Sequence, residues 1–395
     1  MRLSKLGCFI CTLLCVASLV IACHQTTPVG SRVCSQEYDP NIDYFPVKAT
    51  INYATGFDVE YHQHYKTVTV KNPWRNANQS FQYVLVQCGA PVPENFTDSQ
   101  VITIPVNSVV ALSTTHLPHF AKLGLVDKLL GVRDFKQVNT PEVVERIKTG
   151  QLTEVGRNNN LNVENILALN PDLITTFAVG NSQTDNYPQL LEAGLKVAIN
   201  AEYMENSPLG RSEWMKFTAL FFNAEAKAEK IFNEIAEKYE AIAAKTKSLN
   251  NRPTVFVGFD RRGTWFMPGG NSYVAQYLAD AGANYLWQDD DSSGSLPLSF
   301  EVILERAANA EYWLNFSQAW RTIQDILNAD SRYGLFQALQ TGNLYNNDAR
   351  LNEHQGNDYW ESGISNPDIV LADLIKIFHP EILPNHELFY YRQVK

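Results

Sequence analysis

Helical periodicity is clearest between residues 223 and 250, near the middle of the chain. This stretch has no Gly or Pro, and residues with a low free-energy cost in a helix dominate it. Its apolar residues recur at steps of three, four or seven and form one stripe: Ala224, Ala228, Ile231, Ile235, Tyr239, Ile242 and Leu249. At about 1.5 Å per residue the helix would be roughly 40 Å long. The pattern predicts one unbroken helix about as long as a domain is wide.

The segments on either side alternate buried-type strands with amphipathic helices, which is typical of a parallel sheet with crossover helices. The same order of elements occurs twice, with a period of about 140 residues. Residues 161–167 (LNVENIL) correspond to residues 298–304 (LSFEVIL), and each leads into a helix and then a strand. We therefore predict an α/β fold of two Rossmann-like lobes with central β-sheets, residues 48–222 and 251–395, joined by the single rigid helix 223–250.

Residues 48–105 show the two-residue alternation of strands. Phe57–Tyr61 and Lys66–Val70 alternate apolar and polar side chains, and further strand-like runs follow before residue 105. We predict an antiparallel β appendage to the first lobe in residues 48–105. The sequence suggests no role for it.

The first 22 residues have the pattern of a secretory signal. Arg2 and Lys5 precede an apolar run, residues 6–20, that is too short to span a bilayer comfortably. The run ends in VIAC, which resembles a bacterial lipoprotein signal, with cleavage before Cys23 and lipidation of that residue. An ordinary secretory signal or an uncleaved anchor is the alternative. Residues 23–47 would then tether the protein to a membrane, in the periplasm or at the cell surface.

Charge and cysteine content agree with an exported protein. The net charge is −10, and loss of the two cations in residues 1–22 takes it to about −12, which disfavours nucleic acid as a partner. Three further cysteines lie in the signal, so Cys34 and Cys88 remain after Cys23 is lipidated. A disulfide between them is plausible outside the cytoplasm, but the sequence does not show that they meet.

Two α/β lobes leave a cleft, and ligands of such sheets bind outside the carboxyl ends of the strands. The loops expected there are rich in Arg, which suits oxyanions, and in aromatic residues, which form apolar walls. Any one Arg could instead be a surface charge or pair with a neighbouring Asp. The candidate ligand-binding residues are Thr115, His116, Arg133, Arg157, Phe177, Arg261, Trp265, Phe316, Trp320, Tyr359 and Trp360.

Motifs for catalysis are missing from the sequence. It has no nucleophile elbow, phosphate loop, HExxH or Cys-x-x-Cys motif. His116 and His119 are not accompanied by the acidic or thiol ligands of a metal site. We therefore predict a protein that is not an enzyme and has neither a cofactor nor a metal site of its own.

Glu164 and Glu301 occupy equivalent places in the two copies, each at the start of a helix. A carboxylate there is favoured by the helix dipole and can cap free N–H groups, which alone would explain both residues. Alternatively, each lobe displays one carboxylate to a symmetric partner that has Arg pockets.

Longer tracts carry a family resemblance over about residues 50–395. They are VIAC, VVALSTTHLPHFAKLGLVDKLLGV, NVENILALNPDLITTF, NAEYMENSPLGRSEWMKFTALFF and GNDYWESGISNPDIVLADLIKIFHPEILP. They resemble the substrate-binding lipoproteins of ABC importers for iron–siderophore complexes and vitamin B12. The resemblance implies lobes on one rigid helix and a cleft that barely closes. It also implies that Glu164 and Glu301 dock onto Arg residues of a permease dimer.

The resemblance also implies a ligand, a ferric siderophore that a monomeric protein delivers to the ABC permease dimer and its ATPase. Arg133, Arg157 and Arg261 would bind ligand oxygens. The aromatic residues that would wall the site are Trp265, Phe316, Tyr359 and Trp360. Cobalamin, haem or a free metal ion are alternative ligands, and haem would favour His116 or Tyr359 as its axial ligand.

Overall fold

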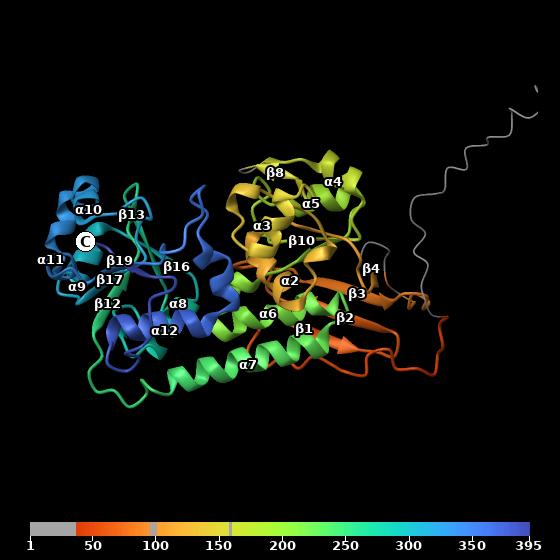
Figure 1. The fold of residues 1–395 in the computed structure, drawn as a ribbon, viewed down its shortest axis with the longest axis horizontal. Coiled ribbons are helices and arrows are strands. Elements are labelled where there is room, and N and C mark those ends of the chain that lie inside the picture. Colours follow the sequence, from red (N-terminus) through yellow and green to blue (C-terminus); the bar gives the residue numbers. More distant parts are fainter. Residues whose placement is uncertain (1–36, 95, 97–100, 158–159) are drawn as a thin grey trace, which may run out of the picture. The chain divides into compact units, whose positions relative to one another are not determined.

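Each copy of the sequence repeat folds around a central sheet, and four corresponding strands have the same order in the two sheets (Figure 1). The first sheet has the order β11-β10-β5-β6-β7 and is parallel throughout. Its strands are β5 (Val109–Ala111), β6 (Leu129–Val132), β7 (Thr153–Glu154), β10 (Leu173–Thr176) and β11 (Val197–Ile199).

The second sheet has the order β15-β12-β17-β18-β19, and only β19 runs antiparallel to its neighbour. Its strands are β12 (Thr254–Val257), β15 (Asn284–Tyr285), β17 (Tyr312–Leu314), β18 (Leu344–Asn346) and β19 (Arg392–Gln393). The strands β5, β6, β10 and β11 correspond in order to β12, β15, β17 and β18. The matching topology confirms the predicted α/β fold of two repeated lobes.

The computed structural model describes residues 37–94, 96, 101–157 and 160–395. Tyr38–Lys395 form one compact unit. Its α-helices are α2 (Leu117–Leu123), α3 (Pro141–Lys148), α4 (Val163–Leu169), α5 (Tyr187–Glu192), α6 (Pro208–Leu220), α7 (Glu225–Ala243), α8 (Tyr273–Asp280), α9 (Phe300–Ala307), α10 (Ile323–Ala329), α11 (Gln337–Thr341) and α12 (Pro367–Phe378). Within the described ranges, no helix has the length and apolar character needed to cross a membrane.

The linker helix α7 is shorter than the sequence pattern suggests. It covers 19 residues, Glu225–Ala243, or about 29 Å at the rise of an α-helix. Asn223 does not cap it, because Asn223 has a left-handed backbone and its side chain bonds to Lys66 and Gln87. After residue 243 the chain forms turns, and the Thr246 hydroxyl bonds to the Asp280 carbonyl. The helix is therefore ended by tertiary contacts that no local pattern reveals.

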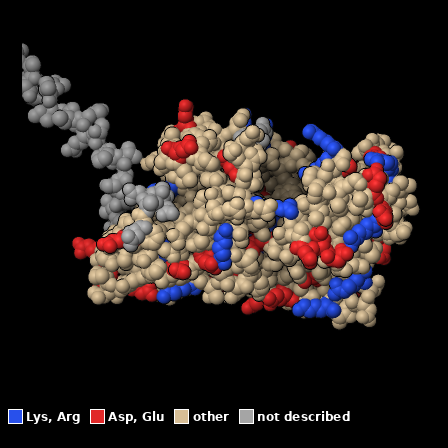
Figure 2. Space-filling view, turned by 180° about the vertical axis from the view of Figure 1, so that it is seen from behind, with Lys and Arg blue, Asp and Glu red and all other residues tan. Residues whose placement is uncertain are grey.

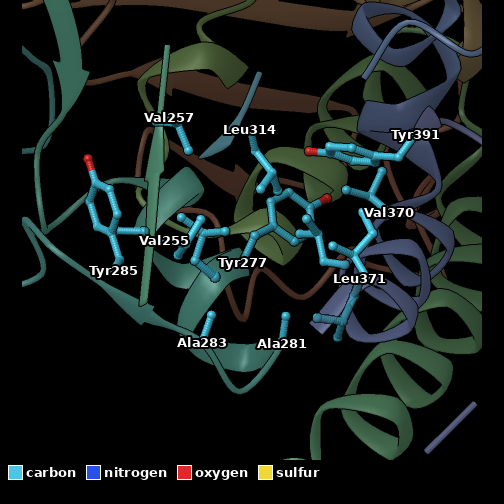
Figure 3. Packing of buried hydrophobic residues seen from close by; sticks show 14 of the residues in the cluster. Val255, Val257, Tyr277, Ala281, Ala283, Tyr285, Leu314, Val370, Leu371 and Tyr391 are labelled. Carbon is cyan, nitrogen blue, oxygen red and sulfur yellow. The ribbon is translucent and has the colours of Figure 1, made fainter. Parts of the chain in front are cut away.

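Helix α7 lies along both α6 of the first lobe and α12 of the second (Figure 1). Every residue of α6 is buried, and apolar residues of α6 and α7 belong to the same core cluster as the second sheet. Figure 3 shows that core, with Val255 and Leu314 of the sheet facing Tyr277 of α8 and Leu371 of α12. The lobes thus share a continuous floor of packed helices.

The residues before β5 form a separate four-stranded sheet, here called the accessory sheet. Its strands are β1 (Phe57–Tyr61), β2 (Tyr65–Val70), β3 (Phe81–Gln87) and β4 (Val101–Ile104), in that order. The sheet was predicted to be antiparallel, but β4 runs parallel to β3. The connection between them, residues 88–100, has the dozen or so residues that a parallel crossover requires.

Several sequence predictions fall outside the described residues. They are the signal peptide, Cys23 and Cys34. Cys88 is disulfide-bonded, so its predicted pairing with Cys34 stays a prediction. Most of the predicted tether, residues 23–47, lies outside the described part as well.

Candidate functional site

A cavity of about 520 Å³ lies at the carboxyl ends of β12 and β17. These two strands are adjacent in the sheet although β15 lies between them in sequence, so the chain reverses direction across the sheet at this point. Such switch points are where open α/β sheets bind ligands. Val257 at the end of β12, residues 258–259 after it and Asn315 after β17 line the cavity. Tyr203 and Met204 from the first lobe complete one wall, and the volume is within the range of small-molecule sites.

The charged residues lining this cavity are both arginines, Arg75 and Arg261. Arg261 lies in β13 (Asp260–Arg261), which pairs with β14 (Thr264–Pro268) in a hairpin. Its guanidinium carbon lies 4.8 Å from the ring centre of Phe259, a cation–π contact that supports the side chain. Figure 2 shows Lys or Arg side chains at the edge of the hollow between the lobes. The cavity therefore has the electrostatic character of an anion site.

Aromatic side chains form the apolar part of the cavity wall. Phe266 and Trp360 are about half exposed, at 48% and 47%, although large apolar side chains are usually buried. Tyr273, at the start of α8, also lines the cavity. Its ring lies 4.2 Å from the guanidinium of Arg211, which Glu202 holds through two hydrogen bonds. The tyrosine ring is thus fixed from behind by a buried ion pair of the first lobe.

Of the predicted ligand residues, Arg261 and Trp360 line this cavity, whereas Trp265 does not. Trp265 is fully buried, and its indole N–H donates to the Val257 carbonyl at 2.8 Å. Side chains of β14 alternate between the core and the cavity, so it is the neighbouring Phe266 that faces the ligand space. Trp265 thus lies on the core face of β14 and Phe266 on its cavity face.

Phe316, Trp320 and Tyr359 lie in aromatic clusters next to the cavity. The ring of Phe316 stacks on that of Trp320 at 6.1 Å, and Trp320 contacts Phe259 at 5.1 Å. Tyr359 is buried with its ring edge on Trp360 at 4.8 Å. These residues support the rings that line the cavity and do not line it themselves.

The predicted residues of the first lobe lie at the ends of its strands. Thr115 and His116 form a 3-10 turn after β5, and Phe177 follows β10 and is 37% exposed. The Thr115 hydroxyl bonds to Ser113. His116 is buried, with Nδ1 3.1 Å from the Thr175 hydroxyl. Burial lowers the pKa of His116 to about 3, so the imidazole is neutral and is part of the core.

The two other predicted arginines lie away from the cavity. Arg157 is exposed on the hairpin of β8 (Gly156–Arg157) and β9 (Asn160–Leu161), and it pairs with Glu154 at 2.7 Å. Arg133 follows β6 and is half-buried, and burial lowers its pKa. Its Nε is enclosed and has no hydrogen-bond partner among the described residues. Arg133 thus keeps unused donor capacity at the carboxyl edge of the first sheet.

Glu164 and Glu301 occupy the second position of α4 and α9. The caps of these helices are Asn162 and Ser299, whose side chains accept from backbone N–H groups. Both carboxylates are exposed. The pKa of Glu301 is lowered by hydrogen bonds from its own N–H and from Ser299, and Arg332 lies 3.4 Å away. The symmetric placement predicted from the repeat is therefore present, on one exposed helix start in each lobe.

Sequence reasoning missed several residues of the cavity: Arg75, Tyr203, Phe266, Tyr273 and Asn315. Asn315 directly follows β17, so its place at a strand end was a usable signal. Arg75 comes from the accessory sheet, and no local pattern connects that loop with the cleft. Within the described ranges, no group of three His, Cys, Asp or Glu side chains is placed to hold a metal ion.

The chain is similar in sequence to a known lipoprotein and similar in fold to solved solute-binding proteins. It is 27% identical over 326 residues to an uncharacterized lipoprotein of Methanocaldococcus jannaschii, which covers 78% of this chain and 75% of the relative. A possible iron-binding periplasmic solute-binding protein from Staphylococcus epidermidis has a similar fold, with a TM-score of 0.54, 16% identity and coverage of 70% of this chain and 99% of that one.

A periplasmic heme-binding protein from Roseiflexus sp. RS-1 is also similar in fold, with a TM-score of 0.52, 19% identity and coverage of 70% of this chain and 99% of that one. Residues 109–351 match the family model of periplasmic binding proteins, which is more than half of the chain. The lipoprotein relative and the family support an extracytoplasmic location. The chain belongs to the periplasmic binding protein family, as an ABC transporter substrate-binding protein and not an enzyme.

Proposed function

We propose that the protein captures an anionic iron chelate, a ferric siderophore, in the cavity and delivers it to an ABC permease dimer. One observation carries the ligand assignment: the cavity combines two arginines with aromatic walls and is lined by no carboxylate among the described residues. A guanidinium presents a planar set of donors that suits carboxylate and similar oxygens, and the rings suit the organic body of a chelator.

An iron chelate also agrees with how the cavity is built. The chelator supplies the metal ligands itself, so the protein needs to recognise only charge and shape. Haem is the second candidate, because a solved relative in fold is a heme-binding protein. The residues expected as its axial ligands, His116 and Tyr359, are both buried in this structure. This burial favours a ligand that brings a complete iron coordination sphere.

The ligand class is tested by titrating the purified protein with four probes while following Trp fluorescence. The probes are a ferric citrate-type complex, an uncharged ferric hydroxamate, cobalamin and haem. Trp360 lines the cavity, so we expect an iron chelate to change the Trp fluorescence until the site is saturated. The anionic complex should bind with the higher affinity of the two iron chelates. Replacing Arg261 by Gln should weaken that binding roughly 10-fold or more, the value of a charge-assisted hydrogen bond.

The matched control for Arg261 is Arg306→Gln. Arg306 lies in the same lobe but pairs with Asp289 and does not line the cavity. Its replacement should leave the affinity unchanged. Failure of every iron chelate to saturate the protein would remove the iron assignment, and a Soret band on adding haem would favour the second candidate instead.

The docking role proposed for Glu164 and Glu301 predicts a separation of transport from binding. Reversing both charges to Lys should abolish uptake in cells while ligand affinity stays within about 2-fold, because neither carboxylate lines the cavity. At the permease, an arginine would replace Arg332 as the partner of Glu301. Glu237→Lys, a single charge reversal on the exposed side of α7, should not affect uptake. Normal uptake by the Glu164/Glu301 double variant would contradict the proposal.

A further inference from the structure

The loop between β2 and β3 of the accessory sheet, residues 71–80, lies beside the cavity. It is outside residues 109–351, the part of the chain that matches the family model. Trp74 anchors the loop on the first lobe, where its ring stacks on Tyr187 at 6.0 Å and packs against the backbone of Gly180. A Cβ at Gly180 would come within 2.5 Å of the Trp74 ring, so the contact is close.

Tyr203 fixes the same loop from the cavity side. Its hydroxyl donates to the Ala178 carbonyl at 2.7 Å and lies 3.4 Å from the Pro73 carbonyl. Tyr203 itself lines the cavity. The loop is therefore held between the first sheet and the cavity. The backbone that carries the residue after Trp74 is fixed in place by these contacts.

That residue is Arg75, which reaches the opposite lobe. Its guanidinium lies over the backbone of Gly294, because a Cβ added there would stand 2.9 Å from its terminal nitrogen and 3.1 Å from its central carbon. Gly294 precedes β16 (Ser295–Leu298), which pairs with β14. Arg75 is exposed, and no ion pair or hydrogen bond is found for it within the described ranges. One cationic side chain thus crosses the cleft with its donors unused.

We propose that the accessory sheet adds a ligand-binding residue to the cleft: Arg75 binds an anionic oxygen of the chelate and makes the protein select anionic over uncharged iron chelates. The inference rests on the proposed iron-chelate function. Arg75 and Arg261 line the same cavity, in which no described carboxylate compensates them. An anion bound there would satisfy both guanidinium groups, whereas an uncharged chelate would satisfy neither fully.

The test measures affinity for a ferric citrate-type anion and for an uncharged ferric hydroxamate in the full-length protein and two variants. Arg75→Gln should weaken binding of the anion by about 10-fold to 100-fold and change binding of the uncharged chelate by less than about 3-fold. Lys71→Gln is the matched control, since Lys71 is in the same loop but pairs with Asp58. It should bind both probes like the unaltered protein.

A third variant tests the contact itself. Gly294→Ala places a Cβ against the Arg75 guanidinium, so it should weaken anion binding when Arg75 is present. Added to Arg75→Gln, the same change should have no further effect on anion binding. Equal affinities of Arg75→Gln and the unaltered protein for the anion would overturn the inference while leaving the iron assignment intact. If the unaltered protein binds neither chelate, the proposed function fails first, and the inference falls with it.

Discussion

Replacing Glu213 by Ala should lower the free energy of unfolding by about 3–5 kcal/mol, the cost of removing one partner from a buried ion pair. The Glu213 side chain is fully buried on α6. It accepts hydrogen bonds from the backbone N–H groups of Asn52, Tyr53 and Ala54 at 3.0, 2.6 and 2.7 Å. It also pairs with the buried Lys216 at 3.0 Å.

The large effect follows from what the truncation leaves behind. Three backbone donors would lose their acceptor, and Lys216 would keep only Glu229 and the Thr50 carbonyl. Buried donors without acceptors each cost roughly 1–3 kcal/mol. The segment they belong to leads into β1, so the accessory sheet should detach before the lobes unfold.

Denaturant unfolding followed by Trp fluorescence measures this effect, together with proteolysis of the accessory sheet. Glu213→Gln keeps the shape and one acceptor, so its loss of stability should be intermediate. Glu237→Ala, at an exposed site on α7, should change stability by less than about 0.5 kcal/mol. A loss below about 1 kcal/mol for Glu213→Ala would show that the carboxylate does not hold this segment.

Replacing Glu361 by Ala should loosen the contact between the lobes and lower the free energy of unfolding by about 3 kcal/mol, because buried hydrogen-bond donors lose their acceptor. Glu361 belongs to the second lobe, but its buried carboxylate accepts from the N–H groups of Asn139 and Thr140 at 2.8 and 2.7 Å. The Thr140 hydroxyl bonds to it as well. These residues precede α3 of the first lobe, where the helix dipole favours a negative charge.

A second bridge lies beside Glu361. The side-chain amide of Asn352 donates to the carbonyls of Lys136 and Val138 at 3.0 and 3.1 Å. These hydrogen bonds and the packed helices between the lobes connect the two lobes at several places. The connection through α7 is therefore not the only one among the described residues. These connections provide a physical reason for the expectation that the cleft barely closes.

Hydrogen exchange of the amides before α3 measures the loosening directly, and solution scattering compares the spread of lobe positions. Burial raises the pKa of Glu361 to about 7, above the 4.5 of an ordinary Glu. The folded state therefore binds a proton more tightly, so the stability difference between the unaltered protein and Glu361→Ala should grow as pH falls from 7 to 4.5.

Glu353→Ala, in the same region but with an exposed carboxylate, is the control and should behave like the unaltered protein. If the Glu361 variant shows unchanged exchange near α3, or if ligand closes the unaltered protein by a large interlobe rotation, the tied-lobe account is wrong.

The repeat could be predicted from the sequence because both copies have the same local features, helix caps and buried strands, at the same spacing. Helix starts such as Asn162 and Ser299, and the buried strands after them, depend on neighbouring residues only. Because strands that alternate with helices are joined by crossovers, the repeat also predicted parallel sheets. This is why the α/β architecture and the pair Glu164 and Glu301 could be placed.

The residues of the candidate cavity were harder to predict, because its geometry depends on contacts between distant segments. Whether Trp265 or Phe266 of β14 faces the cavity is set by which face of the hairpin packs on the core. Arg157 pairs with Glu154 and does not line the cavity, which its place after a predicted strand did not indicate. Arg75 lines the cavity from a loop whose Trp74 packs against Gly180, a contact between residues more than a hundred positions apart in sequence.

The central claim, an anionic iron chelate bound in the cleft, is tested most directly by native mass spectrometry of the protein purified from cells grown with limiting iron. The account predicts one bound molecule per chain, with the isotope pattern of iron in an anionic organic complex, and its loss from the Arg75/Arg261 double Gln variant. A cobalt-containing, haem or metal-free adduct that survives both substitutions would contradict it.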